Sequence, residues 1–583
     1  RKIIQLQANA NYHNVAMGQG QDVVAMLKLD LGHKEGHWVM LQNIHLMPGW
    51  CVELEKRLDA FAAENSHPVF RLFLSADPST GIPIGILERS IKLTNEPPQG
   101  LSANLRRSFA LFSKDDFEER DSRIKAIIFG LCHFHSLMIE RKKFGPLGYN
   151  MKYPFSSGDL RDSASVLYNY LEGSTSVKLP WEDLRYIFGE IMYGGHIVDD
   201  WDREMCKRYL HYFMQDDLLD EQEMVPYAEG KMSWKSPVPG PHEKYLEHIE
   251  AMPPESPLFF GMHPNAEIGF RTVQCRRLFG TLQSLQPRGG PGEAGGGGGG
   301  AEASSAGQAE ELCGEILDEV RDVRFQTEEA SRTLGDEEKG PYQFVLLQEC
   351  DCMNGLVREM VRGLGELQLG FRGELTMSEQ MEQLADALHL ETLPTWWVKL
   401  GFPSTRPLRS WLVNLKERCA QLEDWITELL TIPKVVDLAK LFSPQSFLTA
   451  IKQVYCQQNQ QVELDKLQVF TEVTKRDVKQ VDTAAREGAF VTGTYLEGAR
   501  WDLNANSLED SKPKEMFMRM PVINCKAGLQ LEREDKNVYI CPTYCVPTRS
   551  GYFVFAAQLR TKQPPAKWVL AGVALILDIG YNQ

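Results

Sequence analysis

The segment GHWVMLQNIHL, residues Gly36–Leu46, decides the fold of the N-terminal part of the chain. Its apolar run Trp38–His45 predicts a buried strand. Periodic apolar residues predict a helix on each side of this strand, at Gln21–Asp30 and Trp50–Glu64. A strand between two helices is the repeating unit of an α/β fold.

Two further strands are predicted outward from this centre, at Val69–Ala76 and Ile91–Thr94. Strands that alternate with helices imply a parallel sheet that is covered on both faces. We therefore expect an α/β subdomain over residues 1–122.

Helical periodicity replaces the strand pattern further along and predicts a helical subdomain over residues 123–217. The next segment is rich in proline and poor in periodic apolar residues, so an extended connector is expected over residues 218–258. Helices are expected again over residues 259–470, where apolar residues from Leu346 to Leu367 are spaced three and four apart and predict a packing seam.

Two segments of the C-terminal half depart from this helical pattern. The glycine-rich stretch Arg288–Gln308 predicts a disordered loop, because glycine loses much backbone entropy on ordering and offers few contacts. From residue 471 to residue 583 the pattern drifts toward period two, with Gly, Pro and Asn between the runs. This tail is predicted to be an antiparallel β unit.

Composition places the sequence among ordinary globular proteins and excludes some classes of function. The chain has 583 residues, with 43% hydrophobic and 24% charged side chains, so two to four domains are expected. Its 63 basic and 79 acidic side chains give a net charge of −16, which argues against a general nucleic-acid binder. The longest strongly apolar run, Trp568–Leu577, is far shorter than the about 20 residues that cross a bilayer. We expect no membrane or nucleic-acid partner.

The start of the sequence and its cysteines also carry information. The first residue is Arg1, and the opening lacks the features of a signal peptide, so we expect a fragment of a longer protein. The twelve cysteines are scattered and form no CxxC pair, which indicates reduced thiols in a cytosolic compartment.

Signals for nucleotide chemistry are weak. No GxxxxGK[ST] phosphate loop occurs, and the nearest glycine pattern, Gly18 to Gly20 before a predicted helix, fits a tight turn. The apolar strand ends in Gln42 and Asn43, where an ATPase would place acidic residues to bind magnesium. A neutral amide neither neutralises a divalent cation nor accepts a proton, so a structural or vestigial strand end is expected.

Three clusters resemble metal-binding sets on paper: Cys132 with His133 and His135; Asp199, Asp200 and Asp202; and Cys525, Cys541 and Cys545. Helix neighbours one and two positions apart do not face each other, so the first cluster is expected to hold ordinary core or surface side chains. Asp199 or Asp200 is expected to cap a helix, because two of the three aspartates at a helix start are explained by capping and the helix dipole. Three thiols without a fourth ligand make a poor zinc site.

No GxSxG elbow is present either, and no nucleophile can be tied to a histidine and an acid. Arg89, Arg106 and Arg107 lie near the end of the α/β subdomain, where one of them could reach a neighbouring nucleotide as an arginine finger. Surface salt bridges are the simpler expectation. We predict no catalytic, cofactor-binding or metal-binding residue in this chain.

Seven motifs indicate a family likeness that composition could not provide. They are GHWVMLQNIHL (36–46), LTNEPPQGLSANL (93–105), RKKFGPLGYN (141–150), YGGHIVDDWDR (193–203), GMHPNAEI (261–268), SPQSFLTAI (443–451) and YLEGARWD (495–502). In this order they resemble the terminal part of dynein heavy chains, and the ending YFVFAAQLRTKQPPAKWVLAGVALIL is more similar to ciliary (axonemal) heavy chains than to cytoplasmic ones. The glycine-rich insertion departs from the family pattern.

The resemblance implies a fold and a role. The family builds a ring of six AAA+ modules that converts ATP hydrolysis into movement along microtubules. The sequence would contain an incomplete large subdomain of the sixth module, its helical lid, and a C-terminal domain with a helical part and a small β-barrel-like unit. The sixth module would bind no nucleotide. ATP, magnesium and the microtubule-binding stalk would belong to upstream parts.

The primary expectation is therefore a non-catalytic segment that closes and braces the ring of a ciliary motor, in contact with upstream modules and other dynein chains. Two alternatives stay open: a stand-alone enzyme that binds nucleotide at the Gly18–Gly20 turn, and a docking scaffold for light chains or microtubule doublets. Cytoplasm, cytoskeleton and ciliary axoneme are the expected locations.

Overall fold

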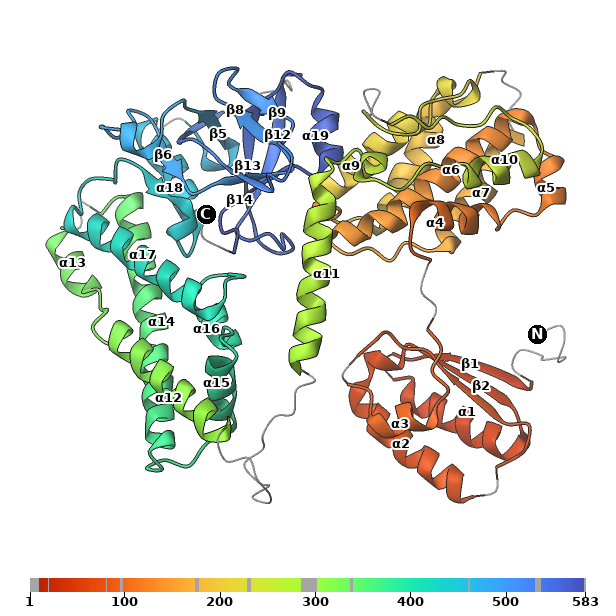
Figure 1. Cartoon of the computed structure of the whole chain (residues 1–583), viewed down its shortest axis with the longest axis horizontal. Helices are drawn as coiled ribbons and strands as arrows, with labels where there is room; N and C mark the ends of the chain where they lie inside the picture. Colours follow the sequence, from red (N-terminus) through yellow and green to blue (C-terminus); the bar gives the residue numbers. More distant parts are fainter. Residues whose placement is uncertain are drawn as a thin grey trace. The chain divides into compact units, whose positions relative to one another are not determined.

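The computed structural model describes residues 10–18, 20–64, 66–79, 81–94, 98–172, 178–227, 232–284, 301–335, 339–459, 462–529 and 536–580 (Figure 1). The protein divides into two units, Arg1–Pro97 and Pro98–Gln583, and each is described by itself.

The N-terminal unit is built on a parallel sheet of three strands in the order β1-β2-β3. Strand β2 (Trp38–Gln42) is the predicted central strand, but it ends before Ile44–Leu46, which form a 3₁₀ turn. Strand β3 (Arg71–Leu74) lies within the predicted second strand, although its side chains are exposed or half-buried and not buried as expected. Strand β1 (Tyr12–Ala16) was not predicted from the sequence. The parallel pairing is confirmed, with β1 and β3 on either side of β2.

Among the described residues, the α-helices of this unit pack against one face of the sheet. The helices are α1 (Asp22–Glu35), α2 (Pro48–Ala63) and α3 (Ile84–Arg89). They enclose a core with Val39 and Leu41, whereas Phe73 on the other face is exposed. The expectation that both faces are covered is wrong for the described residues. The connections from β1 to β2 and from β2 to β3 proceed in the same direction along the sheet. Because such connections are right-handed, their helices lie on the same face.

The short third strand predicted at Ile91–Thr94 does not form. These residues have no strand partner within residues 10–18, 20–64, 66–79 and 81–94, and the side chains of Ile91 and Leu93 are 92% and 89% exposed. A strand forms only where its backbone pairs with a neighbouring strand. The alternation of apolar residues was therefore not sufficient to make this segment a strand.

The first part of the second unit is a helical subdomain, as predicted. Its helices are α4 (Leu101–Phe109), α5 (Lys114–Glu118), α6 (Ser122–Glu140), α7 (Ser157–Glu172), α8 (Trp181–Tyr186) and α9 (Asp200–Phe213). Helix α6 lies at its centre, with fourteen buried residues. Helices α4 and α5 lie within the predicted large subdomain, yet Leu105 and Phe117 on them are buried in this helical core.

The predicted connector contributes to the same core. Helix α10 (His242–Glu250) lies within it, and Trp234, Tyr245 and Ile249 are buried among the residues of the helical subdomain. The segment is therefore not the extended connector that we expected, because its aromatic side chains are buried in the core. The domain boundary itself stays a prediction.

The predicted helical region follows. Its helices are α11 (Asn265–Ser284), α12 (Ala301–Val320), α13 (Thr327–Thr333), α14 (Pro341–Phe371), α15 (Glu379–His389), α16 (Thr395–Leu400), α17 (Leu408–Thr427) and α18 (Pro444–Gln458). The predicted seam from Leu346 to Leu367 is confirmed, because its apolar residues are buried along one side of α14.

Only part of the predicted glycine-rich loop can be compared with the structure. Residues 288–300 lie outside the described residues. Residues 301–308 form the first turns of α12, so the loop prediction is wrong at its C-terminal end. Alanine, glutamate and serine disfavour a helix far less than glycine does, which explains the difference.

The last part contains two main sheets and a short helix. The strands are β4 (Val436–Asp437), β5 (Leu467–Val473), β6 (Ala489–Thr492), β7 (Tyr495–Glu497), β8 (Arg500–Asp502), β9 (Ser507–Glu509), β10 (Phe517–Arg519), β11 (Ile523–Leu529), β12 (Val538–Tyr544), β13 (Phe553–Arg560) and β14 (Ala574–Ile576); helix α19 is Pro565–Ala571. The sheet orders are β10-β7-β14-β12-β13 and β4-β6-β11-β5.

Antiparallel pairs dominate these sheets, although β14 pairs parallel with β12 and β4 parallel with β6. The two sheets approach at β13 and β5, where the amide of Thr471 donates to Gln558 Oε1 and the amide of Gln558 donates to Thr471 Oγ1. The described ladders do not close either sheet on itself, and a barrel-like closure stays a prediction.

Candidate functional site

The predicted glycine turn and strand end lie in the N-terminal unit. Gly20 has a φ of +79°, and the amide of Gln21 donates to the carbonyl of Gly18, which makes a tight turn before α1. Gln42 ends β2, and the amide of Asn43 donates to Ser75 Oγ at 3.2 Å. The side chains at the end of β2 are thus the amides of Gln42 and Asn43.

The cluster on α6 is divided between different surroundings. Cys132, His133 and His135 are all buried, but His135 Nδ1 lies 2.8 Å from Tyr193 Oη, whereas the His133 ring packs against Phe213. Burial lowers the pKa of His133 to about 3 and that of His135 to about 4, so both rings are neutral near pH 7. Among the residues that the structure describes, no group of three or more His, Cys, Asp or Glu residues could hold a metal ion.

The three aspartates near α9 have different roles. Asp199 accepts hydrogen bonds from the amides of Trp201 and Asp202, which confirms it as the helix cap. Asp202 does not act as a cap. Its carboxylate is buried and accepts from the amides of Asn150 and Met151 and from Tyr153 Oη at 2.8 Å.

The remaining candidates do not form a site. All twelve cysteines are free, and Cys525 lies on β11 whereas Cys541 lies on β12 of the other sheet. Arg89 pairs with Asp59, and Arg106 pairs with Glu250 at 3.2 Å, both at the surface. The reach of these arginines toward a neighbouring nucleotide stays a prediction. No helix within the described residues has the length and apolar character needed to span a membrane.

One buried cation of the second unit is Arg141, which follows the last residue of α6. Its guanidinium donates to the carbonyls of Gly148 (2.7 Å), Phe260 (3.0 Å) and Leu570 (2.8 Å) and to Tyr209 Oη (2.6 Å). Leu570 lies on α19, next to the β sheets, whereas the other three partners lie at the helical subdomain. One enclosed cation therefore links the two parts, and Figure 1 places α19 beside α9.

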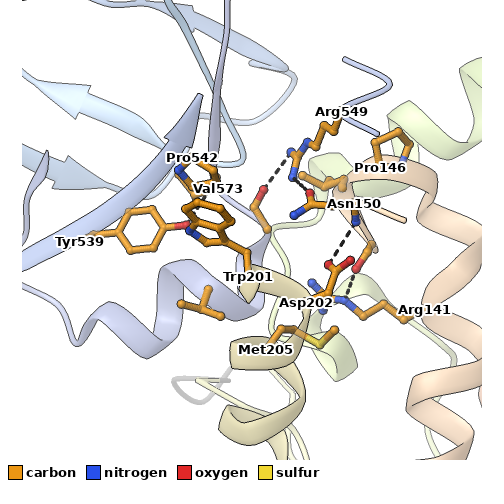
Figure 2. Close-up of a pocket in the computed structure, with 14 residues that line it drawn as sticks. Arg141, Pro146, Asn150, Trp201, Asp202, Met205, Tyr539, Pro542, Arg549 and Val573 are labelled. Atoms are coloured by element: carbon orange, nitrogen blue, oxygen red, sulfur yellow. Dashed lines mark hydrogen bonds between the residues drawn. The ribbon is translucent and has the colours of Figure 1, made fainter. Parts of the chain in front are cut away.

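A second set of buried polar groups lies at the same place. Asn150 donates from Nδ2 to Asp199 and accepts from Arg549, which also donates to Glu497 and to the carbonyl of Gly572. Figure 2 shows Asn150 and Asp202 beside Arg549 from the β part. We call the residues Arg141, Asn150, Asp202, Arg549 and Gly572 the junction.

The junction is too tightly packed to hold a nucleotide. Its cavity has a volume of about 20 Å³, which is on the scale of a water molecule and far below that of a nucleotide. At its edge Trp201 donates from Nε1 to the carbonyl of Ile540 and packs against Phe553. Such an arrangement can transmit displacement between the two parts, because close-packed interiors resist deformation.

Sequence reasoning did not identify the junction. Arg141 and Asn150 lie within one quoted motif and Asp202 within another, but Arg549 and Gly572 lie in the C-terminal segment. Arg141 and Leu570 are 429 positions apart, a pairing that no periodicity reports. An arginine next to two lysines has the pattern of an ordinary charged segment, so the sequence offered no signal for its burial.

The junction predicts a pH dependence of stability. Burial and the charge of Asp199 raise the pKa of Asp202 from 3.8 to about 6. The folded state then binds a proton more tightly than the unfolded state, so the contribution of Asp202 is full below pH 3.8 and lost as pH rises through 6. Urea unfolding of the wild type and of Asp202→Asn measures this. The wild type should gain stability relative to the variant as pH falls from 7 to 4.5, and a constant difference would contradict the assignment.

Comparison with known proteins identifies the family. Residues 272–577 match the family model of the C-terminal domain of dynein heavy chains, residues 124–266 match the dynein heavy chain AAA lid domain, and residues 2–94 match the P-loop domain of dynein heavy chain region D6. The junction thus lies between the lid and the C-terminal domain.

Curated relatives agree over nearly the whole sequence. The dynein beta chain of the flagellar outer arm of Chlamydomonas reinhardtii is 46% identical over 588 residues, which cover 98% of this chain and 12% of the relative. Dynein axonemal heavy chain 9 of Homo sapiens is 44% identical over 591 residues, 99% of this chain and 13% of the relative. The ciliary dynein beta chain of Tripneustes gratilla is 45% identical over 98% of this chain and 13% of the relative. The protein belongs to the dynein heavy chain family and corresponds to the D6, lid and C-terminal domain regions of axonemal heavy chains.

Proposed function

We propose that this chain is a non-catalytic mechanical segment of an axonemal dynein heavy chain, which closes the AAA+ ring and braces it. The whole protein would be an ATP-driven microtubule motor of cilia. Within it, the lid and the C-terminal domain would act as one body that passes strain between the last module and the first.

The observation that supports this role is the buried hydrogen bonding of Arg141. A cation taken out of water is stable only when its donors are satisfied, and Arg141 meets this condition through both the lid and Leu570 of α19. Separating the two parts would leave the charge without one of its acceptors. The junction therefore opposes relative movement of the lid and the C-terminal domain.

The nucleotide and its metal are proposed to bind upstream modules. At the end of β2 the side chains are the amides of Gln42 and Asn43, and amides do not supply the charge that Mg²⁺ requires. These residues do not fit an ATPase site, so we assign no cofactor to this chain. The names of the relatives support a place in the ciliary axoneme, with upstream modules and other dynein chains as partners.

Motility measurements on an intact heavy chain test the proposal that this segment braces the ring. Arg141→Met should change microtubule gliding velocity or ATPase rate without altering ATP affinity, because the ATP-binding modules are untouched. Arg362→Met, which removes an exposed ion pair on α14, is the matched control and should behave as the wild type. Unchanged motility in a folded Arg141→Met motor would count against the brace.

The two alternatives are distinguished by direct binding. A stand-alone enzyme would bind a fluorescent ATP analogue with micromolar affinity when the isolated chain is titrated, and a Gly20→Val variant would lose that binding. The brace predicts no saturable binding. A docking scaffold would retain light chains or doublet microtubules in a ciliary pull-down, whereas the brace requires no such partner.

A further inference from the structure

The first and second halves of helix α11 (Asn265–Ser284) have different surroundings. At the N-terminal end Ala266 is buried in the lid core, and the ring of Phe270 packs against that of Phe144. From Arg271 to Leu282 every residue of the helix is exposed, and Figure 1 shows this part extending away from the lid helices. About three turns of helix are therefore accessible on all sides among the described residues.

The amino acids of these turns do not favour a helix by themselves. Thr272, Val273 and Thr281 are β-branched, and Gly280 has the lowest helix propensity apart from proline. Isolated helices of this length are marginal in water, and most helices in proteins are stabilised by packing of an apolar face. The described residues supply such packing to α11 only at its N-terminal end.

Apolar side chains nevertheless line one side of the exposed turns. Ile268, Cys275 and Leu282 are seven positions apart, and Phe279 follows Cys275 by four, so these side chains share one side of the helix. Leu278 lies next to them. The side chains of Phe279 and Leu282 are 68% and 52% exposed. Single exposed apolar residues are ordinary, but an aligned set on an open helix indicates a contact surface.

The charges on the same helix are all of one sign. From Ile268 to Ser284 the sequence contains three arginines and no aspartate or glutamate, although the whole chain has a net charge of −16. Arg271 and Arg276 follow Ile268 by three and eight positions, which places them on the two sides of the apolar stripe. Cations that flank an apolar stripe complement an acidic surface around an apolar groove.

We propose that residues Ile268–Leu282 of α11 are a docking site for an acidic protein whose apolar groove encloses a single helix, the chemistry of a Ca²⁺-loaded EF-hand pair. The apolar stripe would enter the groove, and the arginines would pair with carboxylates at its rim. The site does not depend on the proposed brace.

Two other occupants fit these observations less well. A lipid surface would cover one side of the helix only, and the net charge of −16 would repel the rest of the chain from anionic lipid. A second copy of this chain would bring the arginines of one α11 against those of the other, and like charges at an interface oppose binding. A groove in an acidic protein meets neither objection.

Calorimetric titration of the purified full chain with calmodulin, as the probe for an EF-hand groove, tests the site. Saturable binding of one calmodulin per chain is expected in Ca²⁺, because Ca²⁺ opens the apolar groove of sensor EF-hands. Binding should be lost in EGTA and should weaken as salt is added. No saturable binding in Ca²⁺, or equal binding in EGTA, would overturn the proposal.

Variants locate the contact. Phe279→Glu should weaken binding at least about tenfold, because it removes an aromatic anchor and places a negative charge against an acidic partner. Val413→Glu is the matched control, since Val413 is a 45% exposed apolar residue on α17, and it should bind as the wild type. Both positions are exposed, so circular dichroism should show an unchanged fold.

Two results with these proteins would contradict the assignment. One is equal calmodulin binding by Phe279→Glu and the wild type. The other is binding of the wild type to vesicles of phosphatidylcholine and phosphatidylserine, lost in Phe279→Glu, without binding to calmodulin, which would assign the helix to a lipid surface.

Discussion

Arg141→Met should lower the free energy of unfolding of this protein by about 3 to 5 kcal/mol. The substitution keeps most of the side-chain volume but removes every donor of the guanidinium. The carbonyls of Gly148 and Leu570 then lose this buried donor, whereas Tyr209 Oη and the carbonyl of Phe260 keep only the hydrogen bond between them. Urea or thermal unfolding of purified protein measures the loss.

Two further variants make this result specific. Arg362→Met removes another paired arginine, but one that is 57% exposed, and it should leave the unfolding curve nearly unchanged. Tyr209→Phe removes one acceptor of Arg141 and should produce a smaller loss than Arg141→Met. If Arg141→Met were as stable as Arg362→Met, the junction would not hold the two parts together.

Gly572→Ala should destabilise the protein by at least about 2 kcal/mol, although it adds a single methyl group. Gly572 follows α19 with a φ of +70°, a backbone conformation that L side chains rarely adopt. A Cβ at this position would also lie 2.3 Å from the carbonyl oxygen of Leu147, on the lid side of the junction. The backbones would have to separate to admit it.

Gly551→Ala separates the two causes. Gly551 has a φ of +79°, but a Cβ there would meet nothing within 4 Å. It should therefore show only the cost of the left-handed backbone, about 1 to 2 kcal/mol. Equal losses from Gly572→Ala and Gly551→Ala, measured by thermal unfolding, would mean that the approach to Leu147 contributes nothing.

Local patterns predicted much of this fold. The burial of α14 follows from apolar residues spaced three and four apart, and the strand β2 follows from its apolar run, because each element is determined by its own side chains. The errors in the N-terminal unit have a different origin. Which face is covered, and whether Ile91–Thr94 pairs, depend on partners elsewhere in the sequence.

The junction could not be predicted from local sequence patterns, because it too depends on partners elsewhere in the sequence. Asp202 was considered only within a group of three aspartates at a helix start, and its carboxylate accepts hydrogen bonds from Asn150 and Tyr153, which no local pattern indicates. Arg141 and Arg549 gain their roles from carbonyls and side chains hundreds of positions away. Charge and helical position give no information about such partners.

Hydrogen exchange of the isolated protein tests the central claim most directly, namely that the lid and the C-terminal domain behave as one body. In the wild type, the amides of α6 in the lid and of β12 in the C-terminal domain should open with the same free energy and the same denaturant dependence. In Arg141→Met the two sets should separate. Independent opening of α6 and β12 in the wild type would contradict the account.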